Sequence, residues 1–128
     1  MNTTDRFIRA ISRKSEISTL NGGYYKVYST PKFTINLGEK IHLRLTLRAA
    51  IDGTIQKEVA VYQTASFSSA GKIYKLSDFV ERYNLDSYRV EEVINQITSS
   101  LVHTKEEIQE YRSLELSAMR QLSEAGFL

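Results

Sequence analysis

The sequence predicts an α+β fold, with a short N-terminal helix, an antiparallel β-meander of about four strands, and C-terminal helices packed on one face of the sheet. The 128 residues suit a single domain, 1–128, because a chain of this length has room for one core. Apolar residues recur at helical spacing in 5–14 and 76–125 but at every second position in 24–75. The 41% apolar and 25% charged residues are ordinary for a folded domain, which excludes wholesale disorder.

Composition also excludes several classes of protein. The absence of cysteine excludes disulfide scaffolds, zinc ribbons and thiol catalysis. No apolar run approaches the ~20 residues of a membrane span, so no membrane partner is expected. The segment Met1–Arg6 lacks the basic and then apolar profile of a signal peptide, and the expected location is therefore the cytoplasm.

The N-terminal helix is expected over residues 5–14. Phe7 and Ile11 fall on one face of it, four residues apart, and this spacing is typical of a helix that buries one side. Thr4 or Asp5 can cap its first turn, because both side chains accept hydrogen bonds from backbone N–H groups.

The most regular strand of the meander covers residues 40–48. Its odd-numbered residues are apolar and its even-numbered residues are polar or basic, which is the pattern of a strand with one buried face. Pairing Leu45 with Val59 aligns the apolar faces of two strands and leaves 51–53 as a three-residue loop that ends in glycine. A two-residue loop would set Leu45 against Ala60 and cross the faces, so the longer loop is predicted.

Shorter strands flank this hairpin. Residues 33–37 alternate apolar with polar after the only proline, and Lys72–Lys75 predicts a further short strand. Turns are expected at Asn21–Gly23 and Ser68–Gly71, where glycine and small polar residues cluster.

The last third of the chain is expected to form three helical segments. The first covers 76–83 and the second 87–101, with a break at Asn84 between them. In the third, Thr104 and Glu107 fit a capping box. Its apolar stripe consists of Ile108, Tyr111, Leu114, Ala118 and Leu122.

Residues 76–96 resemble, in their residue pattern, the helix-turn-helix of lactose-repressor-type regulators. The positions that carry the resemblance are Leu76, Asp78, Phe79 and Glu81 in the first helix, Asn84 in the turn, and Val90, Val93 and Ile94 in the second helix. The resemblance implies a second helix that reads the DNA major groove. Val80 and Tyr83 are bulkier than the motif's small residues, and the segment's net charge of −3 repels phosphate. A helical hairpin packed on the sheet is therefore the preferred interpretation.

The residue types predict binding and not catalysis. Neither His42 nor His103 has a second His, Asp or Glu at metal-ligand spacing. Residues 69–72 lack the upstream glycine of a phosphate-binding loop, and no Gly-x-Ser-x-Gly elbow is present. We therefore expect no catalytic residue, no metal and no cofactor.

Charge is divided unevenly along the chain. Residues 1–75 carry twelve Lys and Arg against five Asp and Glu, a net +7, whereas 76–128 carry five against ten, a net −5. Such a split indicates partners or self-association and says nothing about the fold. A basic half can bind an anion, and an acidic half can bind the basic half of a neighbouring copy.

The first candidate site is the polar face of the 40–48 strand, together with Tyr62 and the tyrosine-bearing segment 24–28. The predicted nucleic-acid-binding residues are Lys26, Lys40, His42, Arg44, Arg48, Tyr24, Tyr28 and Tyr62. Cations hold phosphates and flat rings stack on unpaired bases, so the expected partner is single-stranded DNA or RNA. The alternative is that an exposed face needs polar residues in any case, and that tyrosine is simply a good strand former.

The second candidate site is the acidic helical third. The predicted protein-interface residues are Asp86, Glu91, Glu92, Glu106, Glu107, Glu110, Leu116 and Met119. The carboxylates suit a basic protein surface, and the two apolar residues lie off the main stripe of the last helix, where they suit a homodimer seam. The alternative function is thus a protein–protein interaction module, such as an inhibitor or adaptor from a phage or mobile element.

Overall fold

The computed structural model has helices on either side of a run of strands in the chain, which confirms the predicted α+β class. It describes residues 2–13, 15–20, 23–64 and 69–126. Within these ranges the elements are α1 (Thr3–Ile11), β1 (Glu16–Leu20), β2 (Tyr25–Ser29), β3 (Phe33–Asn36), β4 (Lys40–Ala50), β5 (Ile55–Tyr62), β6 (Lys72–Lys75), α2 (Leu76–Arg82), α3 (Ser87–Ser99) and α4 (Lys105–Glu124). The sheet has six strands where about four were expected. The predicted turns at Asn21–Gly23 and Ser68–Gly71 include residues 21, 22 and 68, which lie outside the described ranges.

The sheet is antiparallel throughout, in the order β1-β2-β4-β5-β6, with β3 also paired to β4. The long central strand β4 pairs with β2 along one half of its edge and with β3 along the other half. The predicted β4–β5 hairpin is confirmed in its register, because Leu45 lies opposite Val59. Gly53 has a φ of 94°, the left-handed conformation that its place in the loop requires.

A bulge separates β2 from β3. Ser29 lies opposite Thr46, and Phe33 lies opposite Leu43. The chain therefore advances four residues between β2 and β3 while β4 advances three, which leaves one extra residue. Thr30 fills the gap: its hydroxyl accepts a 3.0 Å hydrogen bond from the Leu45 N–H. The extra residue changes which side chains of this segment face the core. Before the bulge the even-numbered side chains do so, and after it the odd-numbered ones do.

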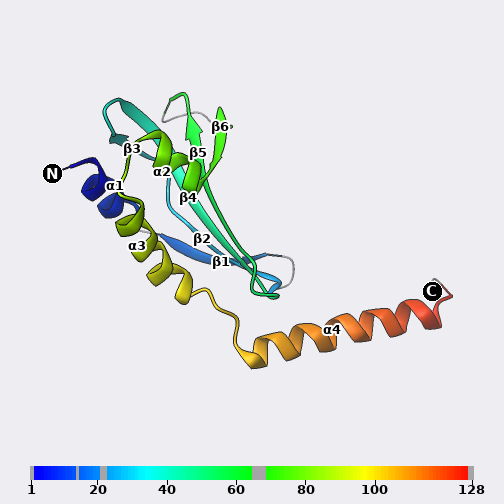
Figure 1. Cartoon of the computed structure of the whole chain (residues 1–128). Coiled ribbons are helices and arrows are strands. Elements are labelled where there is room, and N and C mark those ends of the chain that lie inside the picture. The colour runs from blue at the N-terminus through cyan, green and yellow to red at the C-terminus, as the bar shows by residue number, and fades with distance from the viewer. Residues whose placement is uncertain (1, 14, 21–22, 65–68, 127–128) are drawn as a thin grey trace.

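One face of the sheet is buried under helices. Figure 1 shows α1, α2 and α3 on the same side of the strands, and we call that side the helix-side face. Leu43, Leu45 and Leu47 of β4 are fully buried there, against Phe7 of α1 and Phe79 of α2, whose rings lie 5.5 Å apart. The opposite side, here the open face, has no described helix over it (Figure 1). This arrangement places the core in a single layer between sheet and helices.

The helices of this layer begin close to their predicted positions. α1 is capped by Asn2, whose side chain accepts a 2.8 Å hydrogen bond from the Asp5 N–H, and not by Thr4 or Asp5. Between α2 and α3, Asn84 takes a φ of 52°, which the short side chain of asparagine tolerates. The two helices form the preferred hairpin packed on the sheet, and Val90 and Ile94 bury its inner face.

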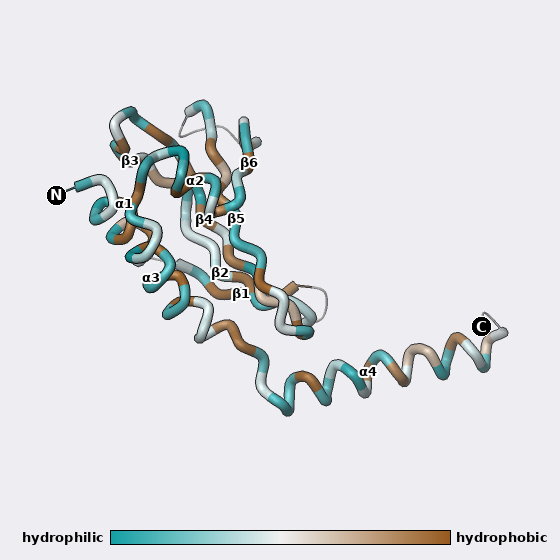
Figure 2. The backbone as a smooth tube through the Cα atoms, in the orientation of Figure 1, coloured by the Kyte–Doolittle hydropathy of each residue, from teal (hydrophilic) through white to brown (hydrophobic). Residues whose placement is uncertain are grey.

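The last helix, α4, behaves differently. It extends away from the rest of the molecule (Figure 1), and none of its 20 residues is buried. Figure 2 shows hydrophobic and hydrophilic turns alternating along its whole length. The predicted capping box of Thr104 and Glu107 is present at its start.

Candidate nucleic-acid interface

The polar row of β4 lies on the open face. Side chains directly opposite each other on antiparallel strands point to the same side, so the register decides which neighbours share the row's face. From β4 the open face carries Lys40, His42, Arg44, Thr46 and Arg48. From the other strands it carries Tyr25, Val27 and Ser29 of β2, Thr34 and Asn36 of β3, Gln56, Glu58, Ala60 and Tyr62 of β5, and Ile73 and Lys75 of β6.

Three cations form a line along β4. Lys40, Arg44 and Arg48 are spaced four residues apart, which separates neighbours by roughly 13 Å along a strand. The Arg44 Nε donates a 3.1 Å hydrogen bond to the Thr30 carbonyl, and the Arg48 guanidinium lies 5.4 Å from the centre of the Tyr25 ring. These contacts hold the stems of both arginines against the sheet.

The open face as a whole is mixed in charge but mainly basic. Its charged residues are Lys32, Lys40, Arg44, Arg48 and Lys75, with the carboxylates Glu16 and Glu58. Cations therefore outnumber carboxylates, and such an excess creates a positive potential that attracts anions.

Tyr62 is on the predicted face but is covered. It lies opposite His42 in the register and is only 8% exposed. The Lys32 ammonium lies 4.3 Å from the centre of its ring. His42 in turn makes a 2.8 Å hydrogen bond through Nδ1 to the Thr34 hydroxyl. The ring of Tyr62 supports the sheet and is not presented to a base.

The prediction that Tyr24, Lys26 and Tyr28 share the face of the β4 cations is wrong. Lys26 pairs with Ala49 and Tyr28 with Leu47, both on the helix-side face. The Tyr28 hydroxyl donates a 2.6 Å hydrogen bond to the Ile11 carbonyl of α1. The cause is the bulge at Thr30, which alternation alone does not reveal.

Tyr24 also lies away from the cation row, near the first turns of α4. Its ring centre is 5.2 Å from that of Tyr111, and the Asp52 carboxylate raises the pKa of its hydroxyl. Tyr25, which the sequence reasoning missed, is the tyrosine of β2 on the open face. Its pairing with Ala50 places it on this face. The sequence signal for the change of face was Pro31, which indicates an irregular segment after β2.

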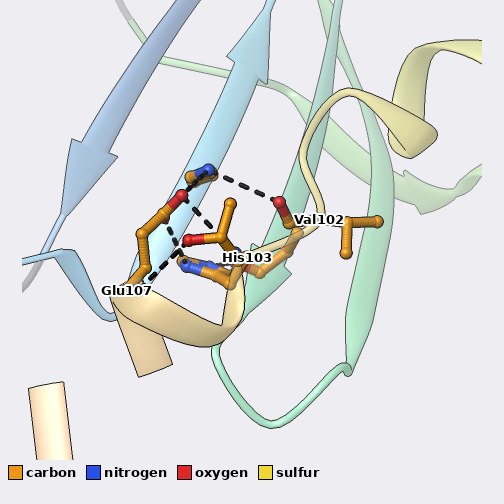
Figure 3. Close-up of polar contacts among 6 residues, drawn as sticks. Val102, His103 and Glu107 are labelled. Carbon is orange, nitrogen blue, oxygen red and sulfur yellow. Dashed lines mark hydrogen bonds and ion pairs between the residues drawn. The ribbon is translucent and has the colours of Figure 1, made fainter. Parts of the chain in front are cut away.

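Lys26 is engaged in a polar cluster with Glu107, and Figure 3 shows Glu107 beside His103 at the start of α4. The Lys26 ammonium lies 2.9 Å from one Glu107 carboxylate oxygen, and His103 Nδ1 lies 3.3 Å from the other. The lysine hydrogen bond holds the pKa of Glu107 below its usual range. His103 also hydrogen-bonds the Ala49 carbonyl through Nε2 at 3.1 Å. Two residues predicted for different sites thus bind each other and fix the start of α4.

The other predicted interface residues are exposed but divided between two regions. Asp86, Glu91 and Glu92 lie at the start of α3 on the body of the molecule, whereas Glu106 and Glu110 lie on α4. Leu116 and Met119 of α4 are 67% and 49% exposed. The acidic residues therefore do not make one continuous surface with the apolar pair.

No described residues form a group of three or more His, Asp or Glu placed to hold a metal ion. None of the helices in the described ranges is long and apolar enough to cross a membrane. Comparison of the chain with protein-family models, curated proteins and solved structures finds no match.

Proposed function

We propose that the open face binds single-stranded nucleic acid. The observation that carries the proposal is the line of Lys40, Arg44 and Arg48 along one 11-residue strand, on a face that no described helix covers. A line of cations roughly 27 Å long suits an extended polyanion better than a small anion.

The arginines can bind phosphate without giving up their structural contacts. Arg44 uses Nε for the Thr30 carbonyl, and this leaves its two terminal nitrogens to donate to phosphate oxygens. Arg48 and Tyr25 together offer a flat cation–ring pair on which an unpaired base can stack. Stacking on Tyr25 takes the place of the stacking expected of Tyr24 and Tyr28.

A second function, protein binding through α4, is favoured by a separate observation. A 20-residue amphipathic helix with no buried residue has an apolar stripe of which Leu114, Met119 and Leu122 are exposed, although Tyr111 packs on Tyr24. Such a stripe marks an interaction surface.

The nucleic-acid proposal is tested by fluorescence anisotropy with labelled single-stranded and duplex DNA and RNA. We expect a preference for single strands, and we expect affinity to fall steeply with salt. Replacing both Arg44 and Arg48 by Gln should reduce the slope of log K against log salt by about 1.4, since each lost phosphate contact contributes about 0.7 for single strands.

The matched control is the double change Arg9→Gln with Arg13→Gln. It removes the same charge from exposed positions on or just after α1, in the helical layer. Equal losses of affinity for the oligonucleotide in the two double variants would contradict the proposal, because they would show that binding depends only on the net charge of the chain. Absence of binding by the native chain at low salt would contradict it as well.

A further inference from the structure

The helix-side face is not completely covered. A hollow of about 620 Å³ lies between β5 and the helices α2 and α3. A second hollow of about 240 Å³ lies at the β4–β5 loop and shares Ile55 with the first. We call the two together the hairpin groove. Its apolar lining includes Ile55, Leu76, Val80, Val90, Ile94 and Leu101.

Whereas the hairpin groove is concave, the apolar stripe of α4 is a convex surface on one side of a helix. At 3.6 residues per turn, the five residues of the predicted stripe, together with Met119 and Ala125, fall within an arc of about 140°, and Leu116 lies outside it. The apolar residues in this arc are Ile108, Tyr111, Leu114, Ala118, Met119, Leu122 and Ala125. Leu114 and Leu122 are 61% and 45% exposed. Two carboxylates lie inside the arc. Glu107 is paired with Lys26, and Glu115 lies between the directions of Leu122 and Ile108.

Ile108, the first residue of the stripe, lines the smaller hollow of its own chain, but the rest of the stripe does not line the hairpin groove. The start of α4 is held by the contacts of His103 with Ala49, of Lys26 with Glu107 and of Tyr24 with Tyr111. From there the helix runs away from the body for about 30 Å (Figure 1). The part of the stripe beyond Ile108 and Tyr111 can therefore be covered only by another molecule.

The stripe and the hairpin groove carry side chains of opposite charge. By register, Lys57 shares the helix-side face of β5 with the buried Val59, and it lines the larger hollow. No ion pair joins Lys57 to any described residue. Glu58, Lys75 and Glu91 also line this hollow. Glu115 is the carboxylate of the stripe that has no ion pair among the described residues, and Lys57 is a half-buried lysine of the hollow that has none either, so the two charges are complementary.

We propose that the chain forms a homodimer in which the α4 stripe of each copy packs in the hairpin groove of the other. In this dimer the exchange is reciprocal, with the stripe of each copy in the groove of the other, so the assembly has two-fold symmetry and leaves no stripe free. Glu115 of one copy then pairs with Lys57 of the other. Lys40, Arg44 and Arg48 line neither hollow, so the inference does not depend on the proposed nucleic-acid binding.

Sedimentation equilibrium of the full chain, with charge-reversal variants, tests this. We expect a concentration-dependent dimer. Glu115→Lys and Lys57→Glu should each weaken dimerisation by about tenfold or more, because each places like charges together in a desolvated contact. The double variant, with both changes, should return to within about threefold of the native constant. Glu124→Lys, the same change on the polar side of α4, should leave dimerisation unaltered.

Three results would overturn the proposal. One is a chain that stays monomeric at about 100 μM, where even a weak dimer is visible. Another is weakening by Glu115→Lys without weakening by Lys57→Glu, which would indicate that two α4 helices pair with each other. The third is a double variant no better than the single ones. Circular dichroism spectra and melting curves of every variant show whether the monomer fold is kept.

Discussion

The two faces of β4 lie in opposite environments, one buried under the helices and the other uncovered. Leu43, Leu45 and Leu47 on the helix-side face are fully buried, whereas Arg44 and Arg48 on the open face are only half-buried. Apolar burial on one face specifies the fold, since a slip of one residue would bring every charge into the core. The open face is under no such constraint, and this leaves its side chains available for a ligand.

The largest loss of stability is expected when a side chain on the buried face is truncated. Leu45→Ala removes a fully buried side chain in the middle of β4, and we expect a loss of about 2–5 kcal/mol in the free energy of unfolding. Urea denaturation measures it. Thr46→Ala, the neighbouring residue on the open face, is the control and should cost about 1 kcal/mol or less. Similar losses at both positions would show that the two faces do not differ as described.

A smaller loss is expected at the bulge. Thr30→Val keeps the shape of the side chain but leaves the buried Leu45 N–H without the hydroxyl oxygen that now accepts its hydrogen bond. An unsatisfied buried donor costs about 1–3 kcal/mol. Thr30→Ser retains the hydroxyl and should lose clearly less in the same urea experiment. If serine and valine destabilise equally, the hydroxyl is not what holds the bulge.

The smallest effect concerns the start of α4 and depends on pH. The folded pKa of Glu107 is lowered, chiefly by the hydrogen bond from Lys26. Its stabilisation is therefore fully present above the unfolded pKa of about 4.3 and is lost as pH falls through the folded value. The unfolding free energy of Glu107→Gln should accordingly depend less on pH in that acidic window.

Lys26→Met removes the lysine and keeps Glu107, so it should flatten the same part of the pH curve. Thermal melts at a series of pH values provide the comparison. Curves for the native chain and both variants that run parallel below pH ~5 would contradict the role given to this ion pair.

The fold and the site differ in how far the sequence could predict them. The β4–β5 register followed from alternation, because only the pairing of Leu45 with Val59 keeps both apolar faces together. The cation row on β4 followed for the same reason. The direction of the β2 side chains did not follow, because a single extra residue at Thr30 reverses them, and periodicity does not count residues across an irregular segment.

The path of α4 was also beyond sequence reasoning. Its apolar stripe is readable, but a stripe indicates only that something should cover it, and the packing of α4 on its own sheet was the simplest expectation. The cluster of Lys26, His103 and Glu107 joins positions far apart in the chain, which no local pattern reveals.

The central claim is that the open face binds a single strand, and nuclear magnetic resonance tests it most directly. The native chain, labelled with ¹⁵N, is titrated with a short unstructured oligonucleotide at low salt, and amide and arginine side-chain shifts are followed. We predict that the largest changes fall on Arg44, Arg48 and Tyr25, with little change along α1 and α4. Changes concentrated on α1 or α4, or no changes at all, would contradict the claim.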